Sequence, residues 1–196
     1  MSSTTRIPKV EITGPYGYLL KRFSRKMLGE VPEGAAVMWQ NRPVLMSLSG
    51  LGRKVQKWDR LDANLKSFAH MAVAAQVGCS FCLDFGYFQA HHDGLDEMKA
   101  SEVPRWREST VFTPLEREVM EYAEAMTETP PRVTDEQSAR LLEQLGAPAL
   151  VELTAIVGFA NLTARGNTAM GIKSQGFSKA CALPLAQPSP GYATSS

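Results

Sequence analysis

Cysteine is scarce in this chain of 196 residues, and neither sign of charge dominates it. The three cysteines are an odd number and only two of them lie close together, which argues against a framework of structural bridges and fits a reducing compartment. The 21 Lys and Arg residues nearly balance the 20 Asp and Glu residues, and no block of like charges stands out. Because the net charge is +1, we expect neither nucleic acid nor an anionic membrane as a partner.

Long apolar runs and low-complexity segments are also lacking. Residues 1–14 contain no apolar run of the kind that follows the basic residues of a secretory signal. The most apolar stretch, 147–162, carries Glu152 and is too short to cross a bilayer. With 12 Pro and 15 Gly the chain is not a low-complexity polymer, and its length corresponds to about one domain. We therefore expect a single cytoplasmic domain.

Apolar residues recur at intervals of three and four, whereas no alternating stretch is long enough to predict a strand. This pattern predicts an all-α bundle over residues 15–178, with an N-terminal arm at 1–14 and an extended C-terminal tail at 179–196. Thr113, Pro114 and Glu116 form a capping box at the start of one helix, and Gly78 and Gly146 are natural helix ends. The expected helices cover 16–27, 35–40, 43–58, 60–77, 79–92, 95–101, 114–126, 134–145 and 147–170.

The segment 76–86, QVGCSFCLDFG, places Cys79 and Cys82 three residues apart at the start of a predicted helix. Unpaired backbone N–H groups and the positive end of the helix dipole favour a thiolate at such a position. They lower the pKa of a thiol from about 8.5 into the range of roughly 3.5–7.5. The two side chains are about 60° apart around the helix axis, so a disulfide closes with little movement. One sulfur can attack a substrate and the other can resolve the product.

Two other roles for the pair stay open, a zinc half-site and two inert core thiols. A zinc site needs about four ligands, and the histidines nearby are His70, His91 and His92. His91 lies about 120° around a continuous helix from Cys79, and no second CxxC is present, so we expect no metal at the pair. No other cofactor is expected. Cys181, alone near the tail, is expected to be structural or incidental.

The chain resembles the carboxymuconolactone decarboxylase superfamily, in the branch of the alkylhydroperoxidase D proteins, in three blocks: AHMAVAAQVGCSFCLDFG, TPLEREVMEYAEAMTETP and LVELTAIVGFANLTARGN. The resemblance covers residues 31–177. It implies an all-α bundle of the alkylhydroperoxidase D-like type that assembles into homo-oligomers. It also implies reduction of hydroperoxides by the CxxC pair, with Cys82 attacked by peroxide, Cys79 resolving the product and an external dithiol as the reductant.

The chain departs from this pattern at three positions that relay a proton in the peroxidase members. Gly86 stands where those members carry a His four residues after the second Cys. Phe81 replaces a His between the two cysteines, and Ser67 replaces a Glu twelve residues before the first. His70 shares the helix face of Ser67, one turn nearer the pair, and a His with a pKa of about 6.5 can act as a base near neutral pH. His70 is therefore the candidate to replace the missing base, and a structural histidine held by hydrogen bonds is the alternative.

Aromatic and polar side chains that follow the pair on its helix predict the substrate pocket. Phe81 and Phe85 make its walls apolar, which suits an organic hydroperoxide, although core packing explains them equally well. Gly86 leaves space one turn beyond the second Cys, and Gln89 continues that face as a polar contact. Asp84 is about 160° away from the second Cys around the helix, so we expect it to cap a segment or to form an ion pair, for instance with an Arg.

These features predict a thiol-dependent peroxidase that uses the pair to reduce organic hydroperoxides. A first alternative is a redox-sensing or binding protein whose pair oxidises without efficient turnover, because the proton relay is missing. A second alternative is a non-redox decarboxylase or lactone-type enzyme, in which a base such as His70 acts on a carboxylated ring. Lys66 or Arg165 would then hold the carboxylate, and the presence of the CxxC pair counts against this alternative.

Overall fold

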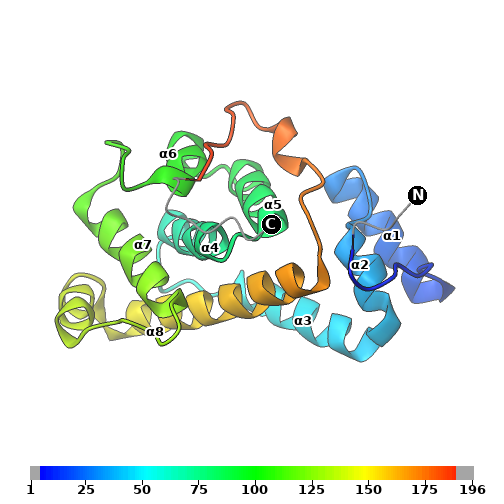
Figure 1. Ribbon diagram of the computed structural model, residues 1–196, viewed down its shortest axis with the longest axis horizontal. Helices are drawn as coiled ribbons and strands as arrows, with labels where there is room; N and C mark the ends of the chain where they lie inside the picture. The colour runs from blue at the N-terminus through cyan, green and yellow to red at the C-terminus, as the bar shows by residue number, and fades with distance from the viewer. Residues whose placement is uncertain (1–4, 189–196) are drawn as a thin grey trace.

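The computed structural model describes residues 5–188, and over this range it consists of helices joined by loops, without β-strands (Figure 1). The prediction of an all-α fold is therefore confirmed. Eight α-helices and three short 3-10 helices follow one another within the described residues: α1 (Gly14–Leu28), α2 (Glu33–Met38), η1 (Trp39–Asn41), α3 (Arg42–Val55), α4 (Ala63–Val77), α5 (Ser80–His92), α6 (Glu97–Glu102), η2 (Val103–Arg105), α7 (Pro114–Thr127), α8 (Asp135–Met170) and η3 (Phe177–Ala180).

Helix α4 lies at the centre of the bundle, in contact with α5, α7 and α8 (Figure 1). Its sequence is apolar on nearly every side, and Phe68, Met71 and Val73 are fully buried. Met120 of α7 and Leu153 of α8 join the same core. Each large apolar side chain buried in this way contributes about 1.5–3 kcal/mol. The core therefore holds α4 in place, including the turn at its C-terminal end that leads into α5.

Capping residues set the helix boundaries and correct two predicted starts. Helix α7 begins at the predicted capping box, in which the side chains of Thr113 and Glu116 each accept a hydrogen bond from the other's backbone N–H. Helix α4 begins at position 63 rather than 60, because the Asp62 carboxylate accepts hydrogen bonds from two free backbone N–H groups of its first turn. Asp96 does the same for α6, which begins at position 97 rather than 95.

Helix α8 is interrupted at Gly146, where φ is 76° and ψ is 162°. A positive φ of this kind favours glycine, so the predicted separation into two helices at this residue is confirmed. Among the helices of residues 5–188, α8 alone is long and apolar enough to cross a membrane. In its most apolar stretch of 18 residues, 33% of the residues are buried inside the protein. The core helix of a soluble protein meets the same criterion, and α8 lies along α4 and α7 (Figure 1).

The first three helices gather at one end of the bundle, around a small core of Ile12, Trp39 and Leu45 (Figure 1). Leu20 of α1 packs against this core, whereas the apolar stripe beside it stays uncovered, since Leu19 is 60% exposed and Phe23 is 64% exposed. A second copy of the chain would give such a stripe a partner, and the homo-oligomer implied by the resemblance stays a prediction.

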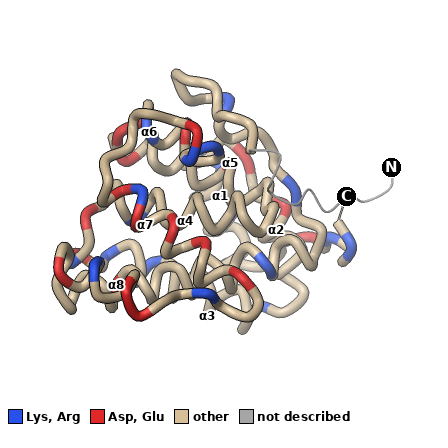
Figure 2. Tube along the Cα trace, turned by 60° about the vertical axis from the view of Figure 1, so that its left-hand side comes forward, with Lys and Arg blue, Asp and Glu red and all other residues tan. Residues whose placement is uncertain are grey.

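Charges of both signs are interspersed along the chain (Figure 2). Some oppositely charged side chains pair with a residue close in sequence, as Arg105 does with Glu102 three positions before it and Arg132 with Glu128 four positions before it. Such pairing agrees with the near-zero net charge of the sequence. The expected lack of a nucleic-acid partner stays a prediction.

Candidate active site at the CxxC turn

The turn between α4 and α5 brings the two cysteines to a helix start. Gly78 ends α4 with a φ of 73°, a left-handed conformation that favours glycine. Cys79 follows as the N-cap of α5, and its sulfur accepts a hydrogen bond from the backbone N–H of Cys82 at 3.2 Å. The helix dipole and the free N–H groups of this first turn therefore point at the sulfurs, as the sequence predicts.

Cys79 and Cys82 are joined by a disulfide, with their Cα atoms 5.3 Å apart. The pair is sheltered, since Cys79 is 2% exposed and Cys82 is 4% exposed. Asn167, near the end of α8, donates a hydrogen bond from Nδ2 to Cys82 Sγ at 3.4 Å. A donor at this distance also stabilises a thiolate on Cys82 when the pair is reduced. Asn167 is the last residue of the third block of the family resemblance, but the sequence alone gives it no role, because its contact with Cys82 spans 85 positions of the chain.

A cavity of about 930 Å³ opens beside the pair, between the α4–α5 turn, the end of α8 and the C-terminal segment. Cys79, Ser80 and Leu83 line it from one side, and Cys181 lines it from the C-terminal segment. Other lining residues are the apolar Ile172, Leu183 and Leu185 and the basic Arg6, Lys173 and Lys179. The volume falls within the range of roughly 300–1,000 Å³ that is typical of small-molecule sites. A molecule bound here would lie next to Cys79.

His70, on α4, packs against α5 at the position where Gly86 lacks a side chain. A Cβ atom added to Gly86 would lie 3.2 Å from His70 Nδ1 and 3.2 Å from Met71 Cγ. Since position 86 follows Cys82 by one helical turn, the imidazole lies about one turn of α5 away from Cys82. Because Gly86 has no side chain, the imidazole of His70 on α4 can lie against α5 at this position. In the peroxidases that the sequence resembles, a histidine of the CxxC helix itself stands at the position of Gly86.

Replacing Gly86 by Ala is expected to stabilise the protein less than the same change at Gly158. Both residues lie inside helices, where Ala is favoured over Gly by roughly 0.5–1 kcal/mol. A Cβ atom at Gly158 meets nothing within 4 Å, whereas one at Gly86 must displace His70 and Met71, which offsets the gain. Urea denaturation of the two variants measures the difference in the free energy of unfolding. Equal stabilisation would contradict the close packing of His70 against α5.

Burial lowers the pKa of His70 to about 4, so the ring is neutral at pH 7 and can accept a proton. In the unfolded chain a His has a pKa of about 6.5. At a pH between about 6.5 and 4, His70 is therefore protonated in the unfolded chain but neutral in the folded protein. The free energy of unfolding is therefore expected to fall as the pH is lowered from about 6.5 to 4, by up to about 1.4 kcal/mol per pH unit from this group. His70→Gln should remove that contribution in urea denaturation curves recorded across this window. A slope unchanged by the substitution would be the contrary result.

Asp84 is buried and anchors the loop that follows α8. Its carboxylate accepts hydrogen bonds from the Ser174 hydroxyl at 2.7 Å and from the backbone N–H groups of Gly176, Phe177 and Ser178 at 2.8, 3.0 and 2.8 Å. Burial alone raises the pKa of Asp84, but the hydrogen bonds from these residues outweigh it and hold the pKa below its usual range. The prediction that Asp84 caps a segment is confirmed, and its partners are hydroxyl and backbone groups rather than an Arg.

The four residues of α5 predicted to form the substrate pocket lie outside the cavity beside Cys79. Phe81 and Phe85 stack on each other with ring centroids 5.8 Å apart, and both meet the edge of Phe177. Gly86 is covered by His70, and Gln89 is half-buried. None of these four α5 residues lines the cavity beside Cys79, so their contact with substrate stays a prediction.

The two cations considered for a carboxylate substrate are held elsewhere. Lys66 forms an ion pair with Glu152 at 3.2 Å and donates a hydrogen bond to a backbone carbonyl. Arg165 donates hydrogen bonds to the side chain of Asn161 and to a backbone carbonyl of α7. Neither residue lines the cavity. This arrangement gives the decarboxylase alternative no support.

Cys181 is the one free cysteine of the chain and is half-buried. Burial, together with the nearby carboxylates of Glu97 and Asp84, raises the pKa of its thiol to about 11. The thiol is therefore protonated near neutral pH and is a poor nucleophile, in contrast to a thiol at the start of α5.

A sequence profile described as the carboxymuconolactone decarboxylase family matches residues 46–125. The chain is 36% identical over 163 residues to YnjA of Escherichia coli, which covers 82% of this chain and 87% of YnjA. It is 28% identical over 119 residues to YdfG of Bacillus subtilis, which covers 60% of this chain and 81% of YdfG. Both relatives are described as uncharacterized proteins.

Two solved structures share the fold over most of the chain. The debrominase Bmp8, determined in complex with 2,3,4-tribromopyrrole, superposes with a TM-score of 0.77 at 20% identity, over 90% of this chain and 95% of Bmp8. A peroxidase-related protein with an alkylhydroperoxidase AhpD core, from Ralstonia eutropha, superposes with a TM-score of 0.78 at 15% identity, over 90% of this chain and 96% of its own. At these identities the likeness shows the fold alone.

Proposed function

Because the chain belongs to the carboxymuconolactone decarboxylase family, in its alkylhydroperoxidase D-like branch, we propose that it is a thiol-disulfide oxidoreductase that reduces organic hydroperoxides. One observation carries this proposal. Cys79 and Cys82 are bonded to each other at the start of α5, beside a cavity large enough for a small molecule.

The proposed reaction starts from the reduced pair. The thiolate of Cys82 attacks one peroxide oxygen, the O–O bond breaks, and the alkoxide that leaves takes up a proton to become an alcohol. Cys82 then carries a sulfenic acid. The thiol of Cys79 attacks this sulfur, the disulfide forms, and the hydroxyl group leaves as water with the thiol proton. An external dithiol, oxidised to its own disulfide, restores both thiols.

The surroundings of the two sulfurs favour Cys82 as the thiolate of the pair. The Asn167 side chain donates to Cys82 Sγ and so stabilises negative charge on Cys82, whereas the backbone N–H of Cys82 at the start of α5 donates to Cys79 Sγ. Cys79 lines the cavity, so a dithiol entering there attacks Cys79 and releases Cys82 as the stabilised thiolate. In this proposal the two sulfurs keep the roles that the family resemblance assigns to them.

His70 is the proposed proton acceptor when the pair reacts. The ring is neutral at pH 7 and lies one helical turn of α5 from Cys82, although its pKa of about 4 makes it a weaker base than a free imidazole. A single water molecule between the ring and the pair suffices for a proton to pass over such a distance. His70 thereby takes the place of the base that is missing at positions 67, 81 and 86.

A brominated pyrrole is the second candidate substrate. The observation that favours it is the shared fold with Bmp8, a debrominase solved with 2,3,4-tribromopyrrole, over 95% of that chain. In this second reaction the Cys82 thiolate attacks a bromine atom, the C–Br bond breaks, and the pyrrole carbon keeps the electron pair of that bond and takes up a proton. The Cys79 thiol then attacks the brominated sulfur of Cys82, the disulfide forms, and bromide and the thiol proton leave. Reduction of a peroxide and removal of bromine each oxidise the Cys79–Cys82 pair by two electrons.

The proposal is tested by titrating free thiols in the reduced protein before and after one equivalent of cumene hydroperoxide. We expect the loss of two thiols, a mass decrease of two hydrogens, and a peptide map that joins Cys79 to Cys82 and leaves Cys181 free. Unchanged thiols would refute the peroxidase proposal, and consumption of tribromopyrrole in the parallel assay would then favour the second substrate. Oxidation of the pair without repeated turnover under excess dithiothreitol would identify a redox sensor instead.

A further inference from the structure

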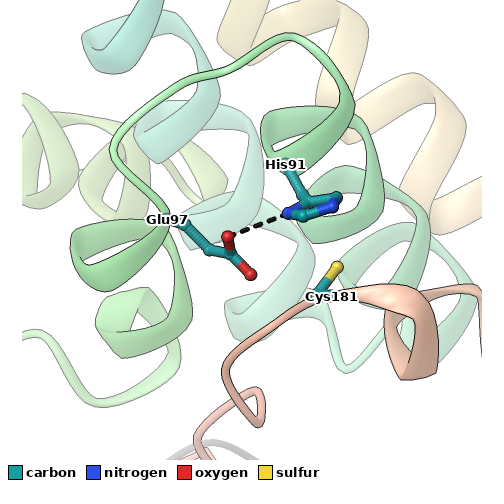
Figure 3. Close-up of side chains that lie close together, drawn as sticks. All are labelled: His91, Glu97 and Cys181. Carbon is teal, nitrogen blue, oxygen red and sulfur yellow. Dashed lines mark hydrogen bonds and ion pairs between the residues drawn. The ribbon is translucent and has the colours of Figure 1, made fainter.

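Three side chains with metal-binding atoms meet at the far end of α5, outside the contacts of the CxxC pair. His91 comes from the last turn of α5, Glu97 from the first turn of α6 and Cys181 from the C-terminal segment (Figure 3). One ligand atom from each lies within 4.8 Å of the other two. All three residues are half-buried, and the proposed redox reaction uses none of them.

We propose that His91, Glu97 and Cys181 bind a zinc ion. Imidazole nitrogen, carboxylate oxygen and thiolate sulfur are the three ligand types that zinc takes in proteins. One thiolate and one carboxylate neutralise the two charges of the ion, and the neutral imidazole completes the protein ligands. Three ligands leave a fourth position of the tetrahedron for a solvent molecule.

The geometry requires only a small adjustment to receive the ion. Zinc lies about 2.0–2.3 Å from such atoms, so the ligand atoms around it are separated by roughly 3–4 Å. His91 Nδ1 and Glu97 Oε2 are now 2.8 Å apart in a hydrogen bond, which must open slightly. The remaining separations of up to 4.8 Å must close by about one ångström. Cys181 lies outside the helices, so its sulfur can move by this distance without distorting a helix.

A surrounding set of hydrogen bonds holds Glu97 with one oxygen free for this role. Its other oxygen, Oε1, accepts hydrogen bonds from the backbone N–H groups of Ala182 at 2.7 Å and Leu183 at 3.3 Å and from the Tyr87 hydroxyl at 3.2 Å. The Tyr87 hydroxyl also contacts the carbonyl of Leu183 at 2.8 Å. Such partners orient metal ligands in known sites and strengthen binding. They fix Oε2 toward His91 and Cys181.

A bound ion would fasten the C-terminal segment to α5 and α6. Cys181 and the residues after it form one wall of the cavity beside Cys79. Binding converts the thiol of Cys181 to a thiolate and releases its proton to solvent. The bound ion would therefore shape the cavity from outside the redox centre.

The test uses the full chain with Cys79 and Cys82 both replaced by Ser, so that the CxxC pair cannot bind metal. Zinc binding is measured by competition with a chromophoric chelator, and Co²⁺ is added separately as a spectroscopic probe. We expect one ion per chain, and an absorption band from cobalt bonded to thiolate. In the same background, Cys181→Ser should remove this band and weaken zinc binding by more than 10-fold, the least that the loss of even a supporting partner produces.

Matched variants separate this site from unspecific binding. His91→Gln should weaken zinc binding to a similar extent, whereas His92→Gln should leave it unchanged, because His92 is the adjacent histidine and stacks on Phe88 instead. Zinc bound equally well by the Cys181→Ser and parent chains would overturn the proposal. So would the loss of zinc on replacing Cys79 and Cys82, or a cobalt spectrum without the thiolate band. Since the background lacks the redox pair, these results do not depend on the proposed oxidoreductase activity.

Discussion

Cys82→Ser is expected to abolish hydroperoxide turnover, with a decrease in kcat/KM on the order of 10³-fold or more. The serine hydroxyl is not ionised near neutral pH, so the Asn167 side chain and the dipole of α5 have no thiolate at position 82 to stabilise. The removal of a nucleophile eliminates the reaction path rather than one interaction along it. Peroxide consumption in the presence of excess dithiothreitol measures the effect.

Cys79→Ser is the matched comparison for this result. It keeps the attacking sulfur and removes the resolving one, so one equivalent of peroxide should leave a sulfenic acid on Cys82 that dimedone labels. Thermal denaturation of both variants shows whether the fold is intact. Full turnover in both single variants would exclude the CxxC mechanism, and labelling of Cys79 in the Cys82→Ser variant would reverse the two roles.

Asp84→Ala is expected to lower the free energy of unfolding by about 3–5 kcal/mol. The substitution leaves the backbone N–H groups of Phe177 and Ser178 without an acceptor, whereas that of Gly176 keeps the Ser174 hydroxyl at 3.1 Å. Hydrogen bonds to a charged group contribute roughly 1.5–3 kcal/mol each. Asp59→Ala is a suitable control, because Asp59 is exposed and forms only a surface ion pair with Arg60 at 3.6 Å. Urea denaturation compares the two variants, and a loss no larger than that of the control would show that Asp84 does not anchor the loop.

The lowered pKa of Asp84 predicts how the free energy of unfolding depends on pH. The pKa of Asp84 is lower in the folded protein than in the unfolded chain, so its contribution is complete above the unfolded value of about 3.9. It is lost as the pH falls through the lower, folded pKa. The Asp84 contribution therefore disappears below about pH 4, whereas that of His70 changes between about 6.5 and 4. Denaturation curves of the two single variants should differ from the parent in these separate windows.

Local signals in the sequence predict most of the helices. The capping box at Thr113, the helix end at Gly78 and the break at Gly146 are each written in a few adjacent residues, and each is confirmed. The reactive turn is equally local, because Cys79 and Cys82 are three positions apart. The starts of α4 and α6 were displaced by a few positions, since the periodicity of apolar residues does not reveal which Asp acts as the cap.

Contacts between distant segments were not predictable in this way. Asn167 reaches Cys82 across 85 positions, and Asp84 reaches Ser178 across 94. The approach of His70 to Gly86 depends on how closely α4 and α5 pack, which periodicity does not report. For the same reason the sequence does not predict that His91 and Cys181 lie close together.

The order of these segments along the chain has a consequence for biosynthesis. The turn with the two sulfurs leaves the ribosome well before Asn167 and the loop at 174–178 that cover it in the finished protein. At about 5–20 residues per second, this interval of some 90 residues lasts roughly 5 to 20 seconds. During that time the nascent thiols are open to oxidants and to foreign thiols, and they become sheltered only when these later segments fold over the turn.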